Sequence, residues 1–472
     1  MAVAVLREKL NDEEREIDAL VVRARAAQER YVDGATQEHY DRAAFAAAWA
    51  LMEPARNSEL AEMAVATTGL GNVTDKITKN HRKTLGLLRD IRHAKTCGII
   101  EEARGITRIA RPAGVVGAVV PSTNPVATPT NNVINALKTG NAVILSPSPK
   151  GVQVCEKLVG YIHDELRKVG ADPDLVQMVP APVSKAKAQR LMEAVDILVV
   201  TGSRNNVQRA YASGTPAIGV GVGNVPVIVD ETADLTDAAA KITASKTFDN
   251  STSCSSENAL VVVDAIYDDF VLALDAAGGR LLAGDSEHML REALFRPEGL
   301  NRTMIAADIS MVLKQADLPA DPDARFLLIE GQGIGAEHPE SGEKLSLVSG
   351  IYRARDFGHA CEVATEILKY EGAGHSIGIH TSDDSRAVAL GHSMPTCRVI
   401  VNQAHCFATG GAFDNDMPFS LSMGCGTWGG NSIDDNFNHT HLMNITKVVR
   451  TIEPNEPALD DIFADHWSVA GK

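Results

Sequence analysis

The sequence lacks any cluster of basic residues. Its 472 residues include 45 Lys and Arg against 61 Asp and Glu, which gives a formal net charge of −16. Nucleic acids and anionic membranes bind concentrated positive charge, so we expect small-molecule partners and no nucleic acid. No run approaches the roughly 20 apolar residues that span a bilayer, and the start has no apolar segment after a basic one. We therefore expect a cytoplasmic protein with no membrane partner.

The chain also lacks paired cysteines. Seven cysteines are scattered from position 97 to position 425 without a C-x-x-C pair. This spacing argues against a disulfide framework and against a zinc site, so we expect no metal and predict that any functional cysteine acts as a thiol.

Helical periodicity dominates the first part of the chain, from residue 13 to about residue 92. Residues 98–112 then form two short β-like runs around a glycine, which predicts a hairpin arm. One more strand, within 445–455, precedes the polar end of the chain, and we expect it to join the sheet of a neighbouring subunit. The arm and this strand favour a homodimer or homotetramer.

From residue 113 onward, short apolar strands alternate with helices. This pattern predicts an α/β fold with a doubly wound parallel sheet that is covered on both faces. We assign residues 1–97 and 113–229 to a nucleotide-binding domain and residues 230–424 to a second α/β catalytic domain. In such sheets ligands bind at the carboxyl ends of the strands.

Two strand-to-helix turns could bind a nucleotide. The turn Thr201-Gly202-Ser203 would place a phosphate at a helix N-terminus, although an ordinary turn explains the pattern equally well on its own. The other turn contributes the polar residues Ser146, Ser148 and Lys150. It lacks the acidic residue that binds a ribose 2′-hydroxyl, so NADP is admissible and NAD remains possible. Lys150 and Arg204 could reach a 2′-phosphate, or could be solvated loop charges.

Cys254 lies among small polar residues directly before an apolar strand. A cysteine in such surroundings can be reached by a substrate, whereas packing cysteines usually have apolar neighbours, so Cys254 is the candidate nucleophile. Asn124 follows a strand and precedes Pro125. Its amide could stabilise an oxyanion together with the Cys254 backbone N–H, although an Asn-Pro turn is the alternative.

These segments resemble the aldehyde dehydrogenase superfamily in their order along the chain, and more closely its CoA-acylating branch. The resemblance covers about residues 90–450 and rests on the motifs PSTNP (121–125), GNAVI (140–144), SPSP (146–149), TGS (201–203), GVGNVP (221–226), FDN (248–250) with Cys254, EKLS (343–346) and GTWGGNS (426–432). It implies that Cys254 attacks an aldehyde, that Asn124 stabilises the oxyanion, and that hydride transfer to a nicotinamide leaves a thioester. By the same resemblance Thr201, Gly202 and Ser203 lie at the cofactor and Glu343 binds its ribose.

The same resemblance points to coenzyme A as the acyl acceptor. Hydrolytic members carry a glutamate 34 positions before the nucleophile, where this chain has Val220. Valine cannot take a proton from water, whereas a thiol needs less assistance as a nucleophile. The glycine-rich segment around Val220 would also leave room for a pantetheine arm. A hydrolytic dehydrogenase and a non-catalytic nucleotide-binding subunit are the alternatives.

The segment 402–418 is more polar and aromatic than in acetaldehyde-specific members, and it resembles that of sulfoacetaldehyde-oxidising members. A short anionic aldehyde is therefore expected, with sulfoacetaldehyde first and succinate semialdehyde or another short aldehyde as alternatives. We expect the substrate pocket to draw on Asn402, His405, Phe407, His439 and His441. His405 and Cys406 should point to opposite faces of a strand-like segment. His375 is expected to be structural.

Overall fold

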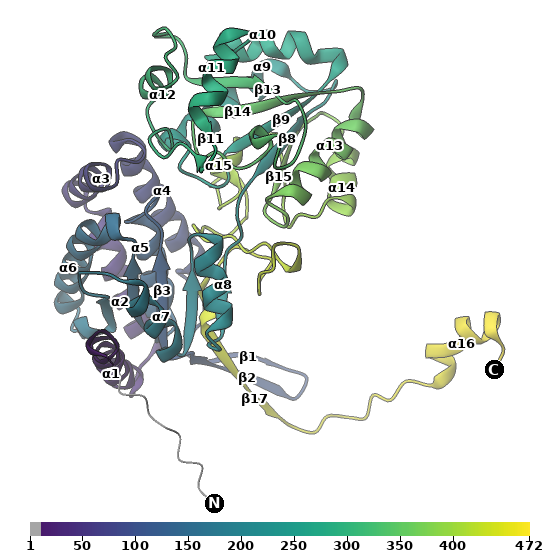
Figure 1. Cartoon of the computed structure of the whole chain (residues 1–472). Helices are drawn as coiled ribbons and strands as arrows, with labels where there is room; N and C mark the ends of the chain where they lie inside the picture. Colours follow the sequence, from purple (N-terminus) through teal and green to yellow (C-terminus); the bar gives the residue numbers. More distant parts are fainter. Residues whose placement is uncertain (1–10) are drawn as a thin grey trace, which may run out of the picture.

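The computed structural model describes residues 11–472, so residues 1–10 of the expected nucleotide-binding domain lie outside it. Two parallel sheets, each with its own helices, are stacked along the long axis of the molecule (Figure 1). A small antiparallel arm projects from the lower body. Within residues 11–472 no helix is both long and apolar enough to cross a bilayer.

The first sheet has the strand order β5-β4-β3-β6-β7 and is entirely parallel. Its strands are β3 (Val115–Val120), β4 (Ala142–Pro147), β5 (Val176–Met178), β6 (Ile197–Val200) and β7 (Ala217–Gly219). The helices of this body are α1 (Asp12–Val32), α2 (Gln37–Met52), α3 (Pro54–Thr68), α4 (Val73–Ile91), α5 (Ala127–Lys138), α6 (Val152–Lys168), α7 (Lys185–Ala194) and α8 (Arg204–Ala212). Every residue of β3 and β4 is buried, which is typical of parallel strands covered on both faces.

The chain runs outward from β3 to β5, returns to β6 beside β3, and continues to β7. The loops after β3 and β6 therefore leave the sheet in opposite directions and open a crevice at the carboxyl ends of these strands. The doubly wound α/β architecture predicted from the alternating pattern is confirmed.

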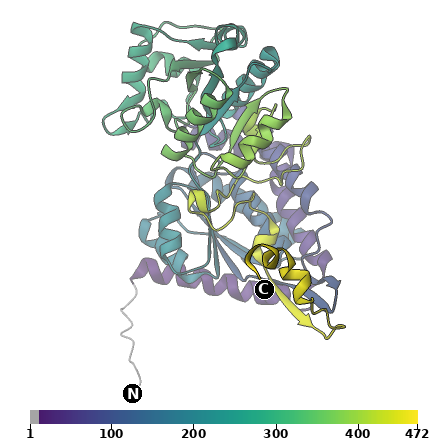
Figure 2. The same cartoon turned by 90° about the vertical axis from the view of Figure 1, so that its right-hand side faces the viewer.

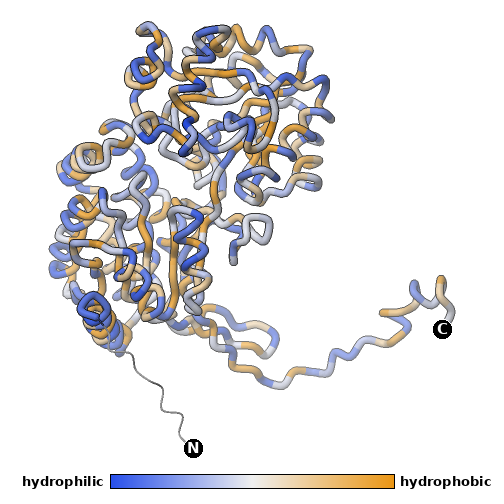
Figure 3. Tube along the Cα trace, in the orientation of Figure 1, coloured by the Kyte–Doolittle hydropathy of each residue, from blue (hydrophilic) through white to orange (hydrophobic). Residues whose placement is uncertain are grey.

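The second sheet is also parallel, with the order β10-β13-β14-β9-β8-β15-β16. Its strands are β8 (Val225–Val229), β9 (Glu257–Val263), β10 (Gly279–Leu281), β13 (Phe326–Glu330), β14 (Val348–Ala354), β15 (Ile377–His380) and β16 (Val399–Val401), and a two-stranded ribbon comprises β11 (Phe295–Arg296) and β12 (Gly299–Leu300). The helices are α9 (Leu235–Thr247), α10 (Tyr267–Ala276), α11 (Asp285–Leu294), α12 (Ile309–Gln315), α13 (Phe357–Tyr370), α14 (Asp384–Ser393) and the single turn α15 (His405–Ala408). Alternate residues of β9 enter different hydrophobic clusters, so both faces of this sheet are buried. Figure 3 shows the apolar colour concentrated on the strands of both bodies.

One expected boundary differs in the structure. Residues 225–229 were assigned to the nucleotide-binding domain, but β8 pairs with β9 and β15 in the second sheet. The glycine-rich segment before β8 crosses from one sheet to the other, and Val227 and Val229 then pack in the core of the second body.

The arm is a three-stranded antiparallel sheet of β1 (Gly98–Ala103), β2 (Ile106–Pro112) and β17 (Met443–Val449). The hairpin is present as predicted. The last strand pairs with β2 of its own chain, because residues 443–449 run antiparallel to residues 106–112 in continuous register. It is the edge strand of this sheet, and its expected pairing with a neighbouring subunit stays a prediction. Beyond it, an extended segment leads to α16 (Leu459–Ala470), which stands away from the body in Figure 1 and projects toward the viewer in Figure 2.

Candidate active site

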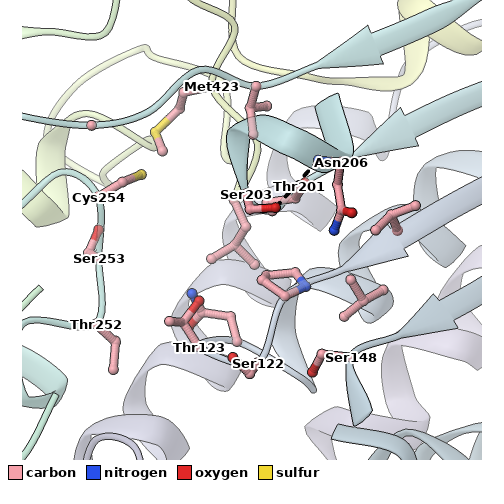
Figure 4. A pocket seen from close by; sticks show the side chains of 18 of the residues that line it. Ser122, Thr123, Ser148, Thr201, Ser203, Asn206, Thr252, Ser253, Cys254 and Met423 are labelled. Carbon is pink, nitrogen blue, oxygen red and sulfur yellow. Dashed lines mark hydrogen bonds between the residues drawn. The ribbon is translucent and has the colours of Figure 1, made fainter. Parts of the chain in front are cut away.

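A cavity of about 700 Å³ lies where the carboxyl ends of the first sheet meet the amino ends of the second. Residues after β3, β4, β6 and β7 line one side, and the loops before β9 and β14 line the other. Figure 4 shows Cys254 and Met423 on one side of this cavity, with Thr201, Ser203 and Asn206 across from them. The cavity therefore joins the predicted nucleotide edge to the predicted nucleophile.

The loop that carries Cys254 has a strained backbone. Between α9 and β9, the residues Asp249, Asn250 and Ser251 have φ values of 49°, 51° and 63°, a conformation that side-chain-bearing residues rarely adopt. Such strain persists only where the surroundings hold it. Here the fully buried Asp249 carboxylate forms ion pairs with Lys76 (3.1 Å) and Lys79 on α4. The nucleophile is thus positioned by a helix about 170 residues earlier in the chain.

Cys254 is a protonated thiol when the site is empty. Burial, followed by the charge of Glu343, raises the pKa of Cys254 to about 12. The Nε2 atom of His375 lies 3.3 Å from its Sγ. Burial and the nearby Arg398 lower the pKa of His375 to about 3, so its imidazole is neutral and only weakly basic in the free protein.

His375 was expected to be structural, but the structure places it against the nucleophile. It lies 121 residues after Cys254 and directly precedes β15, and no local sequence pattern marks it. Its Nδ1 contacts Ser376 Oγ at 2.8 Å, and the same oxygen contacts His405 Nε2 at 2.9 Å. This buried chain fixes the orientation of the imidazole ring.

Asn124 lies at the cavity just after β3, held by a residue that sequence reasoning missed. Lys79 Nζ donates a hydrogen bond to Asn124 Oδ1 at 2.9 Å and another to Thr252 Oγ1 at 2.8 Å. The carbonyl oxygen of the amide is therefore engaged. Its N–H group has no partner among residues 11–472 and is free to bind an oxygen in the cavity. This is the orientation that an oxyanion donor requires.

Both sides of the cavity present unpaired polar atoms. Ser148 Oγ and Glu343 Oε1 are buried and have no hydrogen-bond partner in the described part of the chain. Burial, and then the charge of Glu371, raises the pKa of Glu343 to about 8. Ser146 and the turn Thr201–Ser203 also line the cavity. Buried polar groups without partners are rare in folded proteins, so these atoms indicate a missing ligand.

Two of the predicted cofactor contacts lie elsewhere. Lys150 Nζ donates to the Thr68 carbonyl at 3.4 Å and does not line the cavity. Arg204, the first residue of α8, lines a smaller neighbouring cavity. The cations that line the main cavity near α7 and α8 are Lys185 and Arg209.

The predicted substrate residues are only partly brought together. Phe407 lines the cavity and packs on Phe248 with 4.6 Å between ring centroids. Asn402 does not line it: this residue has a φ of 52°, and its amide bonds both the N–H and the carbonyl of Thr381. Its role here is to hold the turn after β16.

The three histidines also lie outside the cavity wall. His405 is fully buried behind it, and the strand-like conformation expected for residues 405 and 406 is wrong because they begin the helical turn α15. His439 and His441 belong to the 3₁₀ helix His439–Leu442, which packs against α5. Burial lowers the pKa of His439 to about 4, which leaves it neutral. All three are structural in position.

Val220 lines the cavity together with the glycine-rich crossing segment. Two of these glycines lie in close contact with neighbouring residues. A Cβ on Gly223 would lie 2.1 Å from the Cys254 carbonyl oxygen, and one on Gly221 would lie 2.7 Å from Cys425 Sγ. Close packing therefore requires glycine at these two positions, and the passage of pantetheine along the segment stays a prediction.

In this site a cysteine faces the nucleotide edge of a doubly wound sheet, and an amide N–H that can donate to a carbonyl oxygen lines the same cavity. This is the arrangement of a nucleotide-dependent enzyme that processes a carbonyl group through a covalent cysteine adduct. Comparison with known proteins agrees: the aldehyde dehydrogenase family matches residues 5–293, and the chain belongs to this family.

The curated relative sulfoacetaldehyde dehydrogenase (acylating) of Cupriavidus necator is 53% identical over 465 residues, covering 97% of this chain and 93% of its own. The crystal structure of an acetylating aldehyde dehydrogenase from Geobacillus thermoglucosidasius has a TM-score of 0.90 at 32% identity, covering 94% of this chain and 98% of that one. A Rhodopseudomonas palustris propionaldehyde dehydrogenase with bound CoA and an acylated cysteine has a TM-score of 0.82 at 25% identity, covering 92% and 97%.

Proposed function

We propose that this protein is a CoA-acylating dehydrogenase of a short anionic aldehyde, with sulfoacetaldehyde as the first candidate. One observation carries the proposal: the Cys254 thiol, the free amide N–H of Asn124 and the uncharged Val220 line a single cavity. The Cupriavidus necator relative, named for this substrate and for acylation, supports it.

Carbon–sulfur bond formation begins the reaction. Cys254 Sγ attacks the aldehyde carbon while its proton passes to His375 Nε2, 3.3 Å away, and the negative charge that develops on the aldehyde oxygen makes this imidazole more basic during the step. The oxygen of the thiohemiacetal then takes up hydrogen bonds from Asn124 and from the Cys254 backbone N–H. Lys79 keeps the amide in the required orientation throughout.

The polar atoms on the two sides of the cavity fit a nicotinamide cofactor. Glu343 would bind its ribose hydroxyls, and Ser146, Ser148 and the turn Thr201–Ser203 would contact its phosphates. When bound, this cofactor accepts the hydride from the thiohemiacetal carbon. The missing carboxylate after β4 supports NADP as well as NAD, and Lys185 or Arg209 could bind a 2′-phosphate.

Release of the acyl group is assigned to the CoA thiol. Among residues 11–472, Glu343 is the one carboxylate that lines the cavity, and the position that serves water activation in hydrolytic members is Val220. A thiol attacks a thioester without the help that water needs, so acyl transfer to CoA is faster than hydrolysis. The products are the acyl-CoA and the reduced cofactor.

A homodimer or homotetramer is proposed from the apolar surface of the arm and tail. Ile99 on β1 and Val449 on β17 are more than half exposed, and α16 has no buried residue. An isolated helix of about 12 residues is marginally stable in water, so α16 requires a partner surface. Light scattering on a chain that ends at Val449 should give fewer subunits per particle than on the full chain.

The proposed activity is tested by the initial rate of NADPH formation from sulfoacetaldehyde with and without CoA, repeated with NAD, succinate semialdehyde and acetaldehyde. We expect a rate that requires CoA and is highest with sulfoacetaldehyde, and no rate in Cys254→Ser. Steady turnover without CoA would refute the acylating assignment. CoA-dependent turnover with a preference for another aldehyde would refute the substrate alone.

A further inference from the structure

The helix α4 brings three cations to the cavity: Lys79, Arg82 and Lys83. Lys79 forms an ion pair with the buried Asp249 carboxylate, which it shares with Lys76. The other two face the part of the cavity walled by Phe248, Cys406, Phe407 and Gly410. Unlike Lys79, neither of these two cations forms an ion pair with a carboxylate among residues 11–472.

Arg82 lies over two aromatic rings and has no salt bridge within residues 11–472. Its guanidinium lies 4.9 Å from the centroid of Phe407 and 6.0 Å from that of Phe413. The exposed Asp414 is close enough to influence its pKa but forms no ion pair with it. The five N–H donors of this guanidinium are therefore available to a ligand.

Lys83 is buried, and its only described hydrogen bond runs from Nζ to the Gly410 carbonyl at 2.6 Å. Burial, and then the charge of Arg82, lowers the pKa of Lys83 to about 7. A buried ammonium is costly without a counter-ion, and no carboxylate of the described chain pairs with this one.

Arg89, two turns further along α4, shows what a structural arginine on this helix looks like. It also stacks on Phe413 and Phe419, but it forms an ion pair with Asp90 at 2.8 Å and donates to the Ala412 carbonyl at 3.1 Å. Its donors are engaged within the protein. Arg82 has the same stacking and none of these polar contacts, which distinguishes it as a ligand-binding group.

We propose that Arg82 and Lys83 bind the anionic group of the substrate and so determine its selection over neutral aldehydes. This inference rests on the proposed function and names the residues responsible for the substrate class. A sulfonate offers three acceptor oxygens, enough for the planar guanidinium and the ammonium together. Phe248 and Phe407 would contact the methylene group that separates the sulfonate from the carbonyl group at Cys254.

The test compares wild type, Arg82→Gln, Arg82→Lys and Lys83→Met in CoA-dependent cofactor reduction with sulfoacetaldehyde and with acetaldehyde. We expect Arg82→Gln and Lys83→Met to lower kcat/KM for sulfoacetaldehyde by about 100-fold and Arg82→Lys by less, because each truncation removes one partner of a shielded charge pair. For acetaldehyde kcat/KM should change by less than about threefold. Arg92→Gln, which removes an exposed charge from the end of the same helix, is the matched control. An equal loss for both aldehydes would overturn the proposal.

A second measurement separates this inference from the proposed function. Ethanesulfonate, which has no carbonyl group, should inhibit acetaldehyde turnover competitively in wild type and in Arg92→Gln, with at least a tenfold weaker inhibition constant in Arg82→Gln. The same inhibition in Arg82→Gln, or none in wild type, would overturn the anion site. Failure of sulfoacetaldehyde as a substrate, with ethanesulfonate inhibition intact, would overturn only the substrate assignment.

Discussion

The protonated state of Cys254 gives a quantitative prediction for its reactivity. With a pKa of about 12, about one thiol in 10⁴ is ionised at pH 8, against about one in four for an unperturbed cysteine. The higher basicity makes each thiolate about 25- to 60-fold more nucleophilic, which offsets part of this deficit. The net expectation is alkylation about 40- to 100-fold slower than for a free cysteine.

The assay is alkylation by iodoacetamide in the absence of substrate and cofactor, with the modified peptide identified by mass spectrometry. We expect the rate at Cys254 to keep rising up to pH 10, because the pKa lies above that range, by about tenfold per pH unit except near pH 8, where ionisation of Glu343 makes the rise shallower. Cys155, fully buried in the first body, serves as the control for unfolding. A plateau below pH 9 would mean that the thiolate is already stabilised, and it would refute the argument from burial.

Glu343→Gln extends the same prediction. Glu343 has a pKa of about 8, so its carboxylate forms above pH 8 and then opposes ionisation of Cys254. The glutamine variant should leave alkylation unchanged below pH 7 and accelerate it above pH 8. Equal acceleration at all pH values would mean that the substitution opens the site instead of removing a charge.

Three further substitutions test the catalytic assignments, each with folding checked by thermal melting. Asn124→Ala should lower kcat by about 100- to 1000-fold through loss of an oxyanion donor, whereas a loss confined to KM would contradict that role. His375→Ala should lower kcat by at least about 100-fold near neutral pH, and the deficit should shrink as the pH rises and hydroxide replaces the base. A deficit that does not change with pH would make His375 a purely positioning residue. Val220→Glu should raise aldehyde oxidation without CoA, and an unchanged CoA-independent rate in the folded variant would contradict the assignment of this position.

Local sequence pattern by itself determines much of this protein. Continuous apolar strands between helices predict covered parallel sheets because both faces must be buried, and the hairpin arm follows from two short β-like runs around a glycine. The ordered motifs around Asn124, Cys254 and Glu343 predicted three residues that do line one cavity. These features are encoded within a few neighbouring residues, so spacing and residue type reveal them.

The tertiary structure alone decided which distant groups surround the chemistry. Lys79 and Arg82 belong to α4, a helix whose sequence contains no motif that predicts a site. The chain crosses from one sheet to the other, and this crossing brings the nucleophile loop and Phe407 to that helix. His375 reaches Cys254 only because β15 and β9 both flank β8, so that the loops that precede them meet at the same end of the sheet. His439 and His441 looked equally promising in the sequence and lie elsewhere. Chain order carries no information on such proximity, because contacts between residues more than 100 positions apart depend on sheet pairing and helix packing.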